Sequence, residues 1–105
     1  FFYPERMVDD GDVAAAAQVK RRAESRIGPL LDRIDEQLAA HGGPWLLGAR
    51  FSAVDPYALM LCRWTRSFAR PARSLPHLAP YLQRMLARPA VQRAFATEKL
   101  VAPLV

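Results

Sequence analysis

The sequence predicts an all-α fold, a small bundle of helices joined by short connections. Apolar residues recur at steps of three and four along much of the chain, which is the spacing of one helical face. No segment shows the period-two alternation of a strand. Glycine and proline separate stretches of helical length. The 105 residues, 1–105, are expected to form one domain.

The first stretch, residues 1–7, has the composition of the last turns of a helix. The chain opens on Phe1 without an initiator methionine, and we expect it to be a fragment of a longer protein. Pro4 and the acidic, glycine-containing residues 9–12 indicate a loop after this stretch.

A long helix is predicted from about residue 13 to residue 40. Pro29 lies inside it and removes one main-chain hydrogen bond, at a cost of about 3 kcal/mol. We therefore expect a kink near Gly28, or two helices that meet there. The sequence His-Gly-Gly-Pro at residues 41–44 stops the helix, with a glycine available for a left-handed C-cap. The residues expected to face the core are Ala23, Ile27, Leu30, Leu31, Ile34 and Leu38.

Three further helices are expected after a short apolar connector at residues 45–48. The first runs from Ser52 to about residue 68 and stops before Pro71. The second covers about residues 77–87, with Pro80 in its first turn, and the third runs from Pro89 to about residue 97. Their expected core residues are Leu78, Leu82, Met85 and Leu86, followed by Val91, Ala94 and Phe95.

The sequence Phe-Ser-Ala-Val-Asp at residues 51–55 predicts a capping box. Ser52 would accept a hydrogen bond from the N–H of residue 55, and the Asp55 carboxylate would accept one from the N–H of Ser52. Phe51 and Pro56 are placed to pack together as a hydrophobic staple.

The residues that follow the box are apolar on nearly every side of the predicted helix. Such a helix is expected to be central and wrapped by its neighbours. Its N-terminus would then be buried, so its free N–H groups need side-chain acceptors. The residues concerned are Val54, Tyr57, Ala58, Leu59, Met60, Leu61 and Cys62.

A capping box that opens the core helix of a small α bundle resembles the C-terminal domain of the glutathione transferase family. The resemblance rests on Gly48, Phe51, Ser52 and Asp55, on the flanking residues 45–57, and on residues 75–95 with their Arg-Pro-Ala-Val sequence. It covers about residues 1–100 and is closest to bacterial members. Ala49 departs from the aspartate that many relatives have.

The resemblance implies an enzyme of two domains. A thioredoxin-like domain, absent from this chain, would hold most of the glutathione site and the catalytic residue. The helical domain would line the site of a hydrophobic electrophile and form part of a homodimer interface. The parent protein would conjugate glutathione to such electrophiles, a detoxification reaction, in the cytoplasm. The alternative is a non-catalytic docking module of the same fold in a protein assembly.

Four residues are candidates for the substrate site. Tyr57 and Trp64 are seven residues apart and so lie on one side of the predicted core helix. The resemblance suggests that they form a wall of the substrate pocket, and plain core packing is the alternative. Phe2 and Met7 are expected to close the same cavity. No residue of the chain is expected to be catalytic.

The remaining composition favours no other class of protein. The formal charge is +5, and Arg63, Arg66, Arg70 and Arg73 form a stripe that we expect to be a solvated or inter-domain face rather than a nucleic-acid site. Cys62, the single cysteine, is expected to be a buried, inert thiol. Two histidines and one cysteine far apart match no metal site. No apolar run is long enough to span a membrane, and the N-terminal residues do not have the pattern that we would expect of a signal peptide.

Overall fold

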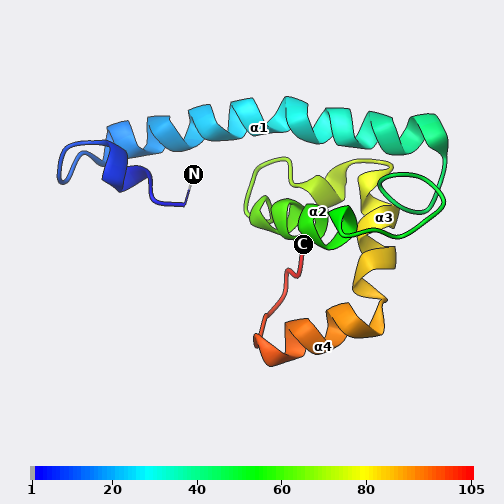
Figure 1. Ribbon diagram of the computed structural model, residues 1–105. Helices are drawn as coiled ribbons and strands as arrows, with labels where there is room; N and C mark the ends of the chain where they lie inside the picture. The colour runs from blue at the N-terminus through cyan, green and yellow to red at the C-terminus, as the bar shows by residue number, and fades with distance from the viewer. Residues whose placement is uncertain (1) are drawn as a thin grey trace. The chain divides into compact units, whose positions relative to one another are not determined.

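The structure is a computed structural model that describes residues 2–105 (Figure 1). Phe1, part of the first predicted segment, lies outside the described residues. Apart from a bridge between Trp45 and Gly48, no strand pairing occurs in residues 2–105, and the all-α class is confirmed. The elements are η1 (Pro4–Met7), α1 (Val13–His41), α2 (Val54–Trp64), η2 (Ala72–Ser74), α3 (Leu78–Leu86) and α4 (Pro89–Thr97).

The chain divides into two compact units, residues 1–31 and residues 32–105. In the first unit, η1 is a 3₁₀-helix that starts at Pro4, with the proline in its first turn. The prediction that residues 1–7 end a longer helix is therefore wrong for the residues described. Tyr3 precedes this turn in a non-helical conformation, and proline suits a helix start because it has no N–H to leave unpaired.

Helix α1 begins where Asp12 caps it, since the Asp12 carboxylate accepts a hydrogen bond from the N–H of Ala15 at 2.9 Å. The helix passes Pro29 without interruption, so the alternative of two helices meeting there is wrong. A bend near Gly28 stays a prediction. Leu30, predicted to face the core, is 55% exposed, whereas its neighbour Leu31 is buried.

The end of α1 follows the prediction. Gly42 has a φ of +61°, the left-handed conformation expected of a C-cap, and its N–H donates to the Leu38 carbonyl at 3.1 Å. The next turn is tight because Gly43 lies against Gly48. A Cβ at position 43 would lie 2.6 Å from main-chain atoms of Gly48, so only glycine fits there.

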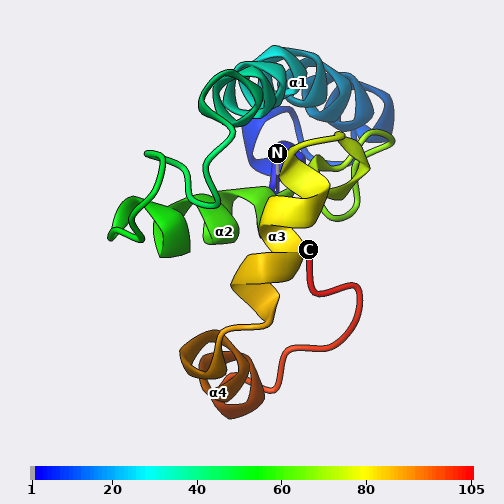
Figure 2. The ribbon, with the colours of Figure 1, turned by 90° about the vertical axis from the view of Figure 1, so that its right-hand side faces the viewer.

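The core of the second unit is built around α3. Leu78, Tyr81, Leu82 and Met85 on this helix are completely buried, together with Ala72 of η2. Figure 2 shows α3 running from the level of α2 to α4. Helix α4 has no fully buried residue: Val91 and Phe95 are half-buried and Ala94 is exposed, so the prediction that all three face inward is only partly right.

Helix α2 is shorter than the predicted range of residues 52–68. It ends at Trp64, where the Thr65 hydroxyl donates to the Cys62 carbonyl at 2.7 Å and accepts from the N–H of Ala72 at 2.9 Å. This buried hydroxyl ties the end of α2 to the start of η2. The chain therefore leaves the helix one turn earlier than its composition suggests.

Candidate functional site

Helix α2 has two different sides. The residues on one side, Asp55, Ala58, Leu59, Cys62 and Arg63, are buried. The residues on the other, Val54, Tyr57, Met60 and Trp64, are exposed. The prediction that neighbours wrap this helix on every side is wrong for residues 32–105.

Tyr57 and Trp64 lie on the same side of α2, as their seven-residue separation predicted, and this side is the exposed one. Tyr57 is 67% exposed and Trp64 is 47% exposed. Neither ring is buried within the unit of residues 32–105. A role of the two rings in a substrate pocket stays a prediction. With Met60, they give α2 an apolar surface that carries one phenol and one indole.

The buried side of the same helix starts with Asp55, a carboxylate with no exposed surface. Its Oδ1 atom accepts from the N–H of Leu46 at 2.9 Å and from the Tyr81 hydroxyl at 3.1 Å. Its Oδ2 atom accepts from the N–H of Ser52 at 2.8 Å. Burial and the Asp55 carboxylate raise the pKa of Tyr81, so its phenol stays a hydrogen-bond donor. A buried charge is tolerated here because several donors surround it.

Only one half of the predicted capping box is present. The Asp55 carboxylate reaches back to the N–H of Ser52, as expected. The N–H of Asp55, however, donates to the Ser52 carbonyl at 3.1 Å and not to its hydroxyl. The helix starts at Val54, so the Ser52 hydroxyl lies one position too early and is 3.4 Å from both the Val54 nitrogen and Asp55 Oδ2.

Phe51, the first residue of the predicted staple, packs against two other side chains. Its ring meets Trp45 edge to face, with centroids 5.2 Å apart. The guanidinium of Arg88 lies over it, 3.7 Å from the centroid. Phe51 and Pro56 line the same groove, which lies between α2 and α4 and has a volume of about 390 Å³. The other residues that line it are Leu59, Met60, Arg88, Ala90, Val91, Ala94 and Phe95.

Phe2 and Met7 belong to residues 1–31. Both are exposed, Phe2 by 45% and Met7 by 76%. Met7 lines a hollow of that unit together with Val19, Arg22, Ala23, Ser25 and Arg26. A shared cavity with Tyr57 and Trp64 stays a prediction.

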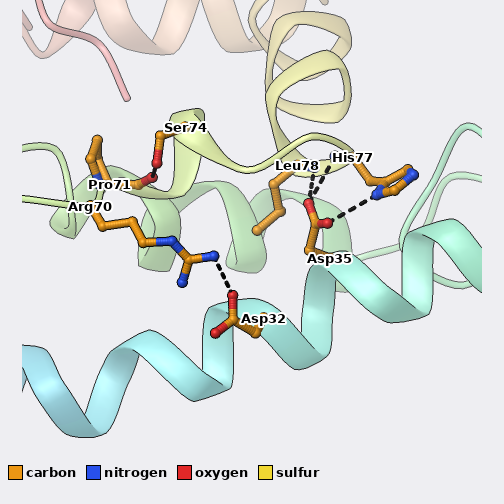
Figure 3. A network of polar contacts seen from close by, with 7 residues as sticks. All are labelled: Asp32, Asp35, Arg70, Pro71, Ser74, His77 and Leu78. Carbon is orange, nitrogen blue, oxygen red and sulfur yellow. Dashed lines mark hydrogen bonds and ion pairs between the residues drawn. The ribbon is translucent and has the colours of Figure 1, made fainter.

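A second buried carboxylate, missed by the sequence reasoning, organises the start of α3. Asp35 of α1 accepts from the N–H groups of His77 at 2.8 Å and Leu78 at 2.7 Å, and its other oxygen lies 2.9 Å from His77 Nδ1 (Figure 3). Burial alone would raise the pKa of Asp35, but these hydrogen bonds outweigh it and hold the pKa below its usual value.

One turn earlier on α1, Asp32 forms an exposed ion pair with Arg70 at 2.6 Å (Figure 3). The hydrogen bond from Arg70 lowers the pKa of the Asp32 carboxyl. Asp32 and Asp35 therefore offer an exposed and a buried version of the same side chain on one helix. No signal in the sequence distinguishes them, because their partners lie about 40 residues away.

The predicted arginine stripe is not a uniform solvated face. Arg63 is only 8% exposed, and Arg66, Arg70 and Arg73 each donate to an oxygen of the chain. Each of the four side chains therefore makes a contact within the chain.

Cys62 is 1% exposed, which confirms that its thiol is buried, and burial raises its pKa to about 12. Low reactivity of this thiol stays a prediction. Within residues 2–105 no group of three or more histidine, cysteine, aspartate or glutamate side chains could hold a metal ion. None of the helices described in residues 2–105 is long and apolar enough to cross a membrane.

Comparison with known proteins connects this geometry to a family. The family described as glutathione S-transferase, C-terminal domain, matches residues 6–98. Glutathione S-transferase GstA of Escherichia coli O157:H7 is 38% identical over 56 residues, which cover 53% of this chain and 28% of that protein. The glutathione S-transferase-like protein OpS6 of Beauveria bassiana is 36% identical over 77 residues, 70% of this chain and 35% of that protein.

A third relative, the 2,5-dichlorohydroquinone reductive dechlorinase of Sphingobium indicum, is 34% identical over 79 residues, 70% of this chain and 23% of that protein. The matched part of the chain thus spans between about a quarter and a third of the length of these relatives. No solved structure matches the chain significantly. The family match covers most of the chain, including the helices α1, α2, α3 and α4. The chain therefore belongs to the glutathione S-transferase family, of which it carries the C-terminal helical domain.

Proposed function

We propose that this chain is the substrate-side domain of a glutathione S-transferase that joins the thiolate of glutathione to hydrophobic electrophiles. The observation that carries the proposal is the exposed apolar side of α2, with Tyr57, Met60 and Trp64 on the same helix whose other side builds the core. Exposed apolar side chains grouped on one side of a helix are typical of a surface that binds a ligand or another domain.

The chemistry of that surface suits an aromatic or otherwise apolar substrate. The rings of Tyr57 and Trp64 offer area for stacking, and their O–H and N–H groups offer orientation. We expect the catalytic residue that stabilises the glutathione thiolate to lie in a thioredoxin-like domain. Cys62, the single cysteine of this chain, has a buried thiol and is not a candidate for that role. The chlorinated hydroquinone in the name of one relative is consistent with an aromatic electrophile.

The rest of the proposal concerns the whole protein. We expect a homodimer of bacterial type that works in the cytoplasm in detoxification, with glutathione as its co-substrate and no metal. Phe2 and Met7 would contribute to the substrate cavity. The alternative function is a docking module without catalysis.

The test measures the full-length protein with a series of electrophiles. The changes Tyr57→Phe and Trp64→Phe should alter the relative kcat/KM values across the series while the melting temperature stays nearly constant. Val101→Ala, which changes another exposed apolar residue, 77% exposed, serves as the control and should alter neither.

Two outcomes would contradict the proposal. Flat relative rates together with a lower melting temperature would assign both rings a structural role. Absence of turnover with every electrophile, in a full-length protein that is folded, would favour the docking module.

A further inference from the structure

The segment after α4, residues 98–105, turns back toward α2 and α3. Lys99 has a φ of +51°, a left-handed conformation that reverses the direction of the chain, and the N–H of Leu100 donates to the Phe95 carbonyl at 3.0 Å. Figures 1 and 2 both show the segment, in red, leaving α4 and turning back toward α2 and α3. We call residues 98–105 the strap.

Arg63 of α2 is the first anchor of the strap. Its guanidinium donates to the main-chain oxygens of Pro103, at 3.3 Å, and of Leu104. The same guanidinium lies 5.5 Å from the centroid of the Phe95 ring on α4. One buried side chain of α2 therefore contacts both the strap and the helix that precedes it.

Arg73 is the second anchor. Its guanidinium donates to the main-chain oxygen of Val105 at 2.6 Å and to the Arg66 carbonyl at 3.1 Å. Arg66 in turn donates to the Arg63 carbonyl at 3.1 Å. The two anchoring arginines are thus connected, and a charged donor makes each of these hydrogen bonds stronger than one between neutral groups.

The side chains of the strap are buried at its far end only. Val105 is 4% exposed, whereas Val101 is 77% exposed. Because the end of the strap is buried, the strap can restrain α4, the helix that precedes it.

Helix α4 depends on such attachment because it has no fully buried residue of its own. At its start, Arg88 lies over Phe51, and along its length Val91 and Phe95 line the groove opposite Leu59 and Met60 of α2. Any movement of α4 would change the width of this groove.

We propose that the strap is a conformational device: Arg63 and Arg73 clamp its main-chain oxygens, hold α4 against α2 and so set the width of the groove between them. This inference is independent of the proposed catalytic function. Because the clamp contacts main-chain oxygens, it acts on the path of the strap and not on its side chains.

The test is hydrogen exchange of the full-length protein, followed by mass spectrometry of the segments that cover residues 78–86 and 89–105. Arg73→Met keeps the apolar part of the side chain and removes its donors. We expect exchange in residues 89–105 to become about tenfold faster, since a charged hydrogen bond is strong enough for such a shift in local opening. Exchange in α3, residues 78–86, should not change.

The matched control is Arg70→Met, because Arg70 is exposed and pairs with Asp32 instead of the strap. It should leave residues 89–105 unaffected. Equal exchange in the two variants would overturn the proposal. Faster exchange throughout α3 in Arg73→Met would also overturn it, because the clamp would then stabilise the whole unit. If the Arg63→Met variant folds, its exchange in residues 89–105 should be faster than that of Arg73→Met. If the Arg63→Met variant does not fold, the result for Arg73→Met decides.

Discussion

A buried aspartate accepts main-chain hydrogen bonds at the start of both α2 and α3, but the two aspartates lie at different sequence distances from their donors. Asp55 lies within the first turn of α2 and accepts from the N–H of Ser52, three residues before it. Asp35 lies on α1 and accepts from the N–H of His77, 42 residues after it. The first arrangement follows from a short sequence motif. The second requires that α1 and α3 be packed already, so it exists only in the folded unit.

The two carboxylates also differ in the structural elements that they connect. Asp55 joins the turn at Leu46, the start of α2 and Tyr81 of α3, and it is entirely buried. Asp35 joins α1 to α3 alone and is 8% exposed. The number of elements that meet at each carboxylate, more than the cap itself, should decide how much stability it provides.

The largest expected effect is that of Asp55→Ala. The change leaves the N–H groups of Leu46 and Ser52 without their acceptor. The Tyr81 hydroxyl keeps only the Asp55 main-chain oxygen, at 3.3 Å. We expect the free energy of unfolding to fall by about 3 kcal/mol, because several buried donors lose a charged partner at once. Urea denaturation of the variant measures it. Asp55→Asn, which keeps one acceptor oxygen, should lose less, and a loss below about 1 kcal/mol for the alanine variant would refute the role of Asp55 as a junction.

The second effect is that of Asp35→Ala, with Asp32→Ala as the matched control on the same helix. Loss of the cap of α3 should cost about 1–2 kcal/mol, which is the upper part of the range for helix caps. The Asp32 variant should cost close to nothing, since its ion pair with Arg70 is exposed. Thermal melts distinguish them, and equal melting temperatures would show that the buried position of Asp35 adds nothing.

Melting temperatures measured over a range of pH test the contribution of the Asp35 carboxylate directly. The folded pKa of Asp35 is lowered, so its contribution to stability is fully present above the unfolded value of about 3.9 and is lost as the pH falls through the folded pKa. The melting temperature of the wild type should therefore exceed that of Asp35→Asn at pH 7. The difference should shrink once the pH drops below about 4. A difference that stays constant down to pH 2 would contradict the lowered pKa.

The smallest expected effect is that of Ser52→Ala. A serine at an N-cap normally contributes about 1 kcal/mol. Here the hydroxyl is 3.4 Å from both of its neighbours, which is too long for a strong hydrogen bond. We expect a cost of less than about 0.5 kcal/mol in urea denaturation. A cost near 1 kcal/mol would restore the complete capping box.

Most of the architecture could be predicted from the sequence because the start, extent and end of a helix depend largely on nearby residues. The all-α class, the extent of α1, the C-cap at Gly42 and the reach of Asp55 to Ser52 all depend on neighbours within a few residues. The end of α2 at Trp64 was not predictable, since it depends on a hydroxyl of Thr65 that binds Ala72. Neither were the Asp35 cap and the burial of Arg63, whose partners are about 40 residues away.

Of the candidate site, only the placement of two residues on one side of α2 was predictable from local spacing. A seven-residue separation places Tyr57 and Trp64 on one side of a helix, and the structure has them so. Whether that side is covered depends on how much apolar surface the rest of the unit can bury. The composition of α2 alone does not contain this information, which is why the helix was expected to be wrapped on every side.

The burial of Cys62 has a practical consequence for labelling chemistry. The thiolate is the reactive form of cysteine, and a thiol that is 1% exposed with a pKa of about 12 supplies almost none at neutral pH. Maleimide reagents should therefore modify a cysteine introduced on the surface of this chain and leave Cys62 intact. A pair of dyes, one on α2 and one on α4, could then report the spacing of the two helices in a chain that keeps its native cysteine.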